Sequence, residues 1–248
     1  LDLMYELPSR DDVEECVINE EVIQQGTNPL LVFKQEAEEV QAVRDVSLTI
    51  GGGEFTAIAG PSGSGKTTLL NLIGGLTRPT RGQIWVAGEE LSQMSTGALA
   101  QLRLKQIGFI FQAYNLLPVL SAMENAEFPM LLQGVEARER ADRVRRLFAR
   151  TGMAGLEDRR PGKLSGGQQQ RVAVVRAVAS KPALVLADEP TANLDSSSSE
   201  SLLEVMAELN LNLGVTFVFA THDDRVMKRA RRLIRMVDGA IDSDEIKT

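Results

Sequence analysis

Short apolar runs bounded by glycine and polar residues recur along the chain and predict β-strands. The predicted strands are residues 30–33, 46–50, 54–59, 83–87, 183–187 and 215–220. The last two runs are apolar at nearly every position, which is typical of strands buried on both faces. Helical spacing of apolar residues predicts helices at 65–74, 96–106, 136–150, 168–179 and 196–209. Residues 101–162 contain only a short apolar run, at 107–111, and are expected to form a helical insertion. Strands that alternate with helices indicate an α/β fold with a mainly parallel sheet.

Composition changes this picture mainly at the N-terminus. Residues 1–30 carry eight acids and one base, whereas residues 31–248 carry equal numbers of each. A neutral body offers no electrostatic surface for nucleic acid, so no nucleic-acid partner is expected. No apolar run approaches the ~18 residues of a membrane helix, and residues 1–25 show no secretory signal. A single cysteine, Cys16, excludes an internal disulfide. We therefore expect a soluble, cytosolic chain.

The segment from Gly60 to Thr67 carries the strongest chemical signal. It matches the phosphate-loop pattern and lies between a predicted strand and a predicted helix, as that pattern requires. Glycines let backbone N–H groups face phosphate oxygens, and the helix N-terminus adds positive potential. Lys66 is expected to reach the β- and γ-phosphates of ATP, and the Thr67 hydroxyl to coordinate Mg²⁺. The alternative is a glycine-rich turn without a ligand. The predicted ATP-binding residues here are Gly60, Pro61, Ser62, Gly63, Ser64, Gly65, Lys66, Thr67 and Thr68.

Two adjacent acids, Asp188 and Glu189, follow the apolar run 183–187. Ligands of open α/β sheets bind at the carboxyl ends of the strands. Because side chains alternate along a strand, neighbouring acids can serve different tasks. Asp188 is expected to hold Mg²⁺, and Glu189 to polarise the attacking water. Alternatively, both acids cap the helix that follows.

Two further segments allow more than one interpretation. Leu164-Ser165-Gly166-Gly167-Gln168, which we call the signature segment, opens a predicted helix. It fits a plain N-terminal cap or a second anion site built from free N–H groups and a hydroxyl. His222, the single histidine, follows the last buried run. A lone histidine at such a place is usually structural, so its assignment depends on the other motifs.

Taken in order, these segments resemble the nucleotide-binding domain of an ABC transporter. The order is the phosphate loop, Gln112, the signature segment, Asp188-Glu189, Asn193-Leu194-Asp195 and His222, and the resemblance covers about residues 31–240. It implies a P-loop NTPase core of the RecA-like type, with an antiparallel β subdomain and an α-helical subdomain. The expected division is an acidic leader (1–29, disordered or helical), the phosphate-loop half with the β subdomain (30–100), the helical subdomain (101–162) and the second half of the core (163–248).

The resemblance implies a role for each matching residue. Phe33 would stack on adenine, although an ordinary strand-end core residue is the alternative. Gln112 would coordinate Mg²⁺, sense the γ-phosphate and relay its state to a membrane partner. Asp195 would couple two ATP sites across a dimer. His222 would bind the γ-phosphate and position water against Glu189. The residues that would contact the ATP of the other subunit are Ser165, Gly166, Gly167 and Gln168.

The implied function is ATP hydrolysis by a head-to-tail dimer that drives a permease through residues 112–125. The chain would then be peripheral, at the cytoplasmic face of the plasma membrane. Residues 74–80, 115–118 and 186–191 resemble a narrower branch, which serves lipoprotein release, macrolide export and cell division. A regulatory ATPase of a cell-division complex, without a transported substrate, is the alternative. A DNA-repair or chromosome ATPase is disfavoured, because residues 68–164 hold no heptad run and no cysteine pair.

Overall fold

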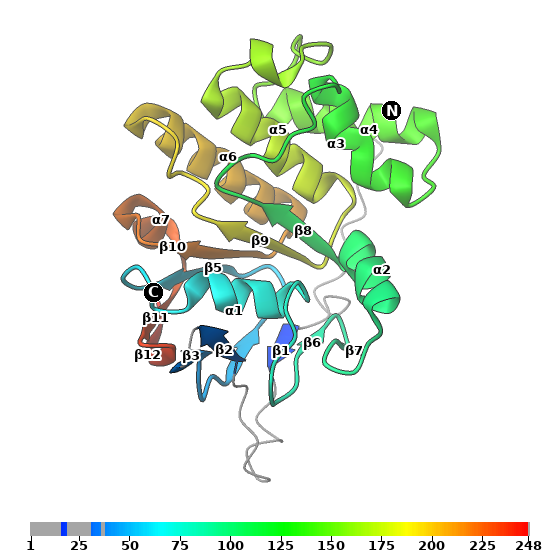
Figure 1. Cartoon of the computed structure of the whole chain (residues 1–248). Coiled ribbons are helices and arrows are strands. Elements are labelled where there is room, and N and C mark those ends of the chain that lie inside the picture. Colours follow the sequence, from blue (N-terminus) through cyan, green and yellow to red (C-terminus); the bar gives the residue numbers. More distant parts are fainter. Residues whose placement is uncertain (1–15, 19–30, 36–37, 248) are drawn as a thin grey trace.

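The computed structural model describes residues 16–18, 31–35 and 38–247, with side chains from residue 42 onward. Its centre is a six-stranded sheet with the strand order β12-β11-β5-β10-β9-β8 (Figure 1). The strands are β5 (Phe55–Ala59), β8 (Ile107–Ile110), β9 (Leu184–Asp188), β10 (Phe217–Thr221), β11 (Arg232–Val237) and β12 (Ala240–Ile246). All neighbours are parallel except β11 and β12. The mainly parallel sheet of the predicted α/β fold is confirmed.

Helices cover both faces of this sheet. Figure 1 shows α1 on one face and α5 and α6 on the other. The helices are α1 (Lys66–Ile73), α2 (Thr96–Gln106), α3 (Ala122–Leu132), α4 (Ala137–Arg150), α5 (Gly166–Ala179), α6 (Ser196–Leu213) and α7 (Asp224–Arg229). A 3₁₀ turn occupies Pro161–Lys163. No helix in the described part of the chain has both the length and the apolarity needed to cross a membrane.

Within the described residues, three two-stranded antiparallel sheets accompany the central sheet, and the family resemblance implied an antiparallel β subdomain. They pair β1 (Cys16–Ile18) with β4 (Leu48–Ile50), β2 (Leu31–Gln35) with β3 (Glu38–Val43), and β6 (Trp85–Val86) with β7 (Glu89–Glu90). β1 belongs to the leader, which was expected to be disordered or helical, so these three residues differ from that expectation. The rest of the leader lies outside the described residues.

Alternating side chains of the central strands enter two separate hydrophobic cores. In β10, Phe217 and Phe219 face the core under α3 to α6, whereas Val218 and Ala220 face the core around α1 and α2. β9 alternates in the same way. This two-sided burial is the physical reason that both runs are apolar at successive positions.

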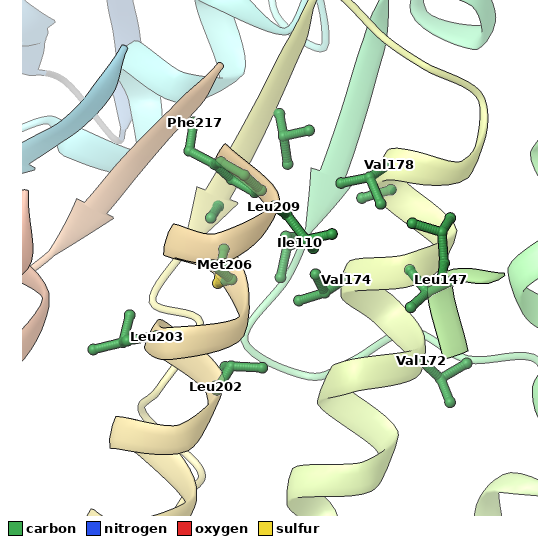
Figure 2. Close-up of a cluster of buried hydrophobic side chains, with 14 of the residues drawn as sticks. Ile110, Leu147, Val172, Val174, Val178, Leu202, Leu203, Met206, Leu209 and Phe217 are labelled. Carbon is green, nitrogen blue, oxygen red and sulfur yellow. The ribbon is translucent and has the colours of Figure 1, made fainter. Parts of the chain in front are cut away.

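The core under α5 and α6 fastens the signature segment to the sheet. Figure 2 shows Val174 of α5 and Met206 of α6 pointing toward Ile110 and Phe217 of the sheet. All four side chains are fully or almost fully buried. Burying one such side chain contributes about 1.5–3 kcal/mol. The N-terminal ends of α5 and α6, which follow Ser165 and Asp195, are therefore held in place.

The structure departs from the sequence pattern in the middle of the chain. Residues 101–162 were expected to be helical apart from a short apolar run, and that run forms β8 within the central sheet, paired with β9. α3 was not predicted, because Pro129 lies inside it and proline normally interrupts a helix. α3 begins with a capping box formed by Ser121 and Glu124. The strands expected at 46–50 and 83–87 are shorter, at 48–50 and 85–86.

Candidate active site

The phosphate loop connects the end of β5 to the start of α1. Gly63 and Gly65 have φ angles of +82° and +96°, in the left-handed region that favours glycine. Position 60 has no room for a side chain, because a Cβ on Gly60 would lie 2.3 Å from the carbonyl oxygen of Met236. The backbone angles therefore favour glycine at Gly63 and Gly65, and the close contact requires it at Gly60.

Lys66 and the start of α1 bring positive potential to the phosphate loop. Lys66 is buried, and its Nζ donates hydrogen bonds of 2.8 Å to the carbonyl oxygens of Gly60 and Pro61. α1 begins without a side-chain cap and without an acid in its first turn. The first N–H groups of a helix lack intrahelical partners and attract anions. The combination suits the phosphates of a nucleotide.

The two residues predicted to hold Mg²⁺ are in contact. Thr67 Oγ1 donates a hydrogen bond of 3.0 Å to Asp188 Oδ1. Among residues 42–247, no group of three or more His, Cys, Asp or Glu side chains could hold a metal ion. One hydroxyl and one carboxylate fit Mg²⁺, which commonly binds one or two carboxylates together with substrate phosphates. Burial raises the pKa of Asp188, the Thr67 hydrogen bond opposes this, and the charge of Glu189 adds to it.

Asp188→Asn is expected to stabilise the nucleotide-free protein at pH 7 while abolishing Mg²⁺-dependent hydrolysis. A carboxyl with a raised folded-state pKa favours folding only at low pH, and this contribution is lost as pH rises through the folded-state pKa. Removing its charge should raise the melting temperature by about 2 °C at pH 7, and the difference should vanish below about pH 4. Thermal unfolding followed by circular dichroism measures this, with the exposed Asp158→Asn as control. A lower melting temperature at pH 7 would contradict it.

Glu189 adopts a backbone conformation that is uncommon for its residue type. Its φ angle is +45°, in a region that costs non-glycine residues about 1 kcal/mol or more. Its N–H donates to the carbonyl oxygen of Ala220 in β10 at 2.9 Å. Such strain occurs often at functional sites, and here it turns the chain immediately after Asp188.

The carboxylate of Glu189 is paired with the histidine. Glu189 Oε1 lies 2.6 Å from His222 Nδ1, and Glu189 Oε2 accepts a hydrogen bond of 3.3 Å from Thr221 Oγ1. The Glu189 side chain is 17% exposed, whereas that of His222 is 71% exposed. The acid is thus covered and held in place, and the imidazole reaches outward beside it. A held carboxylate of this kind can serve as a general base.

A second hydrogen-bonded group steadies the loop that carries His222. Asp223 accepts a hydrogen bond of 2.7 Å from Thr191 Oγ1 and forms an ion pair with Arg225. Burial acts to raise the pKa of Asp223, but the hydrogen bonds from Arg225 and Thr191 outweigh it and keep that pKa below its usual range. The loop after Glu189 and the loop around His222 are joined by these contacts.

The signature segment has the geometry of a helix cap. Ser165 Oγ accepts from the N–H of Gln168 at 3.3 Å, and Gln168 Oε1 accepts from the N–H of Ser165 at 2.9 Å. This is a capping box, so the plain-cap interpretation is confirmed as a description of the local structure. It leaves a second role for the segment as a prediction.

Asp195 lies next to the signature segment. It caps α6 and accepts hydrogen bonds from the N–H and the hydroxyl of Ser198, which lower its pKa. The Ser198 hydroxyl would lie 3.3 Å from a Cβ on Gly167. Within residues 42–247, however, no hydrogen bond or ion pair joins the signature segment to the phosphate loop.

Gln112 follows β8 and is exposed. Its carbonyl oxygen accepts a hydrogen bond of 2.9 Å from Asn193 Nδ2, so its loop is tied to the segment that leads to Asp195. Phe33 lies opposite Val40 in the β2–β3 pair, and its side chain is outside the described part. Its stacking on adenine remains a prediction.

Sequence reasoning overlooked several supporting residues. Thr221 donates to Glu189, and Asn193 donates to the carbonyl oxygen of Gln112. Thr191 and Asp223 bond to each other and join the loops that follow Glu189 and His222. Hydroxyl, carboxylate and amide side chains adjoining a motif were the available signal. The pairings could not be derived, because each joins segments far apart in the chain.

Comparison with known proteins identifies the family. The family model described as ABC transporter matches residues 43–192. An uncharacterized ABC transporter ATP-binding protein of Thermotoga maritima is 47% identical over 207 residues, which are 84% of this chain and 88% of that protein. The lipoprotein-releasing system ATP-binding protein LolD of Anaeromyxobacter dehalogenans is 48% identical over 200 residues, 80% of this chain and 84% of that protein. The macrolide export ATP-binding/permease protein MacB of Hyphomonas neptunium is 49% identical over 206 residues, and these cover 83% of this chain but 32% of that longer protein.

Solved structures agree with the sequence matches. The ATP-binding cassette MJ0796, in a dimeric post-hydrolysis state bound to ADP and Pi, is 35% identical with a TM-score of 0.82. That match covers 94% of this chain and 99% of the cassette. On sequence and fold alike, the chain belongs to the ABC transporter family, as an ATP-binding protein of the branch that contains LolD and MacB.

Proposed function

We propose that the chain is the ATP-hydrolysing subunit of a membrane transporter, and that two copies close head-to-tail over two ATP molecules to drive a permease. The observation that carries this proposal is the covered Glu189 carboxylate, 2.6 Å from His222 Nδ1. The neighbouring acid, Asp188, ends β9 and accepts a hydrogen bond from the Thr67 hydroxyl. A base, a metal-binding pair and a phosphate loop are the parts that ATP hydrolysis needs.

Each residue has a task in this reaction. Lys66 Nζ exchanges the carbonyl oxygens of Gly60 and Pro61 for phosphate oxygens. Thr67 and Asp188 would hold Mg²⁺, which would neutralise part of the phosphate charge. Glu189 accepts a proton from the attacking water while the water oxygen forms a bond to the γ-phosphorus. The bond from the γ-phosphorus to the bridging oxygen breaks, so that ADP leaves and inorganic phosphate is formed.

His222 lies where it can contact the γ-phosphate. Its Nδ1 lies 2.6 Å from Glu189 Oε1, which leaves Nε2 for an oxygen of the γ-phosphate. The ring would then contact Glu189 on one side and the phosphate on the other. This arrangement positions the water between them.

The separation of the signature segment from the phosphate loop supports a dimer. Ser165 and the start of α5 form an N-terminal anion site without a contact to Lys66 of the same chain. In a head-to-tail pair, Ser165, Gly166, Gly167 and Gln168 meet the γ-phosphate that the other copy holds, and Asp195 couples the two sites. MJ0796 is itself described as dimeric.

A groove of about 660 Å³ supports a permease partner. It lies between α2, β8, α3 and α5, and includes Asn115 from the loop after Gln112. Phe109, Phe128 and the exposed Leu76 and Leu132 give it an apolar lining. A permease contact through residues 112–125 and this groove fits the relatives, whose names describe lipoprotein release and macrolide export. We place the chain at the cytoplasmic face of the membrane through that permease alone.

The permease contact is tested by affinity purification from detergent-solubilised membranes. The tagged chain should retain a membrane protein, and Leu132→Asp should lose it, because a carboxylate in an apolar interface costs about 2 kcal/mol or more. Leu211→Asp is the matched control, since Leu211 is also exposed, on α6, but does not line the groove. Equal recovery with both variants would contradict the assignment. A partner without a translocation path would favour the regulatory alternative.

A further inference from the structure

The turn that follows Gln112 has an unfavourable backbone. Tyr114 and Asn115 have φ angles of +56° and +48°, and two successive non-glycine residues in the left-handed region are rare. Local hydrogen bonds from the N–H of Tyr114 to the carbonyl of Phe111, and from Asn115 to Ala113, close the turn. A strained turn persists only where surrounding contacts hold it.

Arg176 of α5 supplies those contacts. Its Nη2 donates a hydrogen bond of 2.9 Å to the carbonyl oxygen of Tyr114, and its Nη1 donates to that of Asn115. Among the described residues, Arg176 forms no ion pair with a carboxylate. Burial lowers the pKa of Arg176, yet a guanidinium stays charged in proteins. The planar guanidinium of Arg176 thus binds two adjacent carbonyl groups through charge-assisted hydrogen bonds.

The turn also touches both predicted halves of the ATP site. Gln112, just before it, accepts a hydrogen bond from Asn193. The Tyr114 hydroxyl donates to the Asn193 carbonyl at 3.4 Å, and it would lie 2.9 Å from a Cβ on Gly166 of the signature segment. Arg176 and Asn115 meanwhile line the 660 Å³ groove. The hydrogen bonds of Arg176 to the turn therefore lie between the groove and the residues that are expected to bind Mg²⁺ and the γ-phosphate.

We propose that Arg176 is a positioning residue of the ATPase, which orients Gln112 and the Tyr114 hydroxyl by holding the carbonyl groups of Tyr114 and Asn115. This inference rests on the proposed function, because it takes Gln112 as a ligand of Mg²⁺. Arg103 lines the same groove but donates to the carbonyl oxygen of Gly75, so it does not hold the turn.

The Mg²⁺ dependence of hydrolysis tests the proposal. In Arg176→Gln, the Mg²⁺ concentration for half-maximal hydrolysis at saturating ATP should rise about tenfold. A tenfold rise corresponds to a loss of about 1.4 kcal/mol in the free energy of Mg²⁺ binding, because Gln112 is no longer held in position. Affinity for a fluorescent ATP analogue without Mg²⁺ should stay within about twofold, because the phosphate loop is untouched. A general loss of folded protein would lower the rate at every Mg²⁺ concentration without moving the midpoint. Arg176→Lys keeps one donor cation and should recover part of the shift.

Amide hydrogen exchange of residues 112–116 gives a second readout that needs no activity. Exchange there should be about tenfold faster in Arg176→Gln, which opens the turn. Two controls should leave both readouts unchanged: Arg103→Gln, in the groove, and Arg171→Gln, which donates to Thr151 and Ser201 elsewhere on α5.

Specific results overturn the inference. An unmoved Mg²⁺ midpoint together with unchanged exchange in Arg176→Gln refutes it, and so does the same shift in Arg103→Gln. If Arg176→Gln does not fold, a wild-type midpoint and wild-type exchange in Arg176→Lys refute it instead. A wild-type chain that binds ATP without hydrolysing it refutes the proposed function, and the exchange experiment still decides whether Arg176 holds the turn.

Discussion

Glu189→Gln is expected to slow ATP hydrolysis by about 10²- to 10⁴-fold, the usual contribution of a general base, while ATP binding stays nearly unchanged. The amide has the same shape as the carboxylate but does not accept a proton from water. It can still receive the hydrogen bond from Thr221 and pair with His222. Lys66, Thr67 and Asp188 are untouched, so the nucleotide keeps its contacts. Phosphate release measured with excess Mg²⁺ and ATP gives the rate.

The same variant should accumulate an ATP-bound dimer. In the proposed dimer, hydrolysis would remove the γ-phosphate that bridges Lys66 of one copy and Ser165 of the other, so a copy unable to hydrolyse would keep the bridge. Light scattering after size-exclusion chromatography in ATP should report twice the monomer mass for Glu189→Gln. Glu208→Gln, an exposed acid on α6, is the control and should retain wild-type activity. A Glu189→Gln protein that is monomeric and fully active would disprove both the base and the dimer.

His222→Ala is expected to lower hydrolysis by about 10²- to 10³-fold, a range typical of losing one preorganised donor at a reacting oxyanion. The 71% exposed imidazole contributes little to folding, so the melting temperature should change by less than about 2 °C. ATP affinity should stay within a few-fold, because Lys66 and the start of α1 provide most of the phosphate contacts. Phosphate release and titration with a fluorescent ATP analogue measure the two effects separately.

A variant of a neighbouring residue distinguishes the loss of the imidazole from damage to the loop that carries His222. Asp224→Asn, two residues after His222, should hydrolyse ATP at the wild-type rate. Unchanged turnover in His222→Ala would return the histidine to a structural role, in which it only supports Glu189.

Some of the site was predictable because its chemistry is local. The phosphate loop depends on glycine spacing within eight residues and on the strand and helix that flank it, and all of these occupy consecutive positions. Capping by Ser165 and Gln168 is equally local. In contrast, α3 was not predicted, because Pro129 lies inside it and proline normally interrupts a helix.

By itself, the sequence determined the α/β class and the buried strands and predicted the residues for phosphate chemistry, since periodicity, glycine freedom and motif spacing act over short distances. Only the tertiary structure decided which distant residues meet. It placed His222 against Glu189 across 33 residues of chain, joined Thr67 to Asp188 across 121, and set Arg176 on the turn after Gln112. The strand order of a parallel sheet brings carboxyl-end loops together, and that order comes from the packing of two cores rather than from any local pattern.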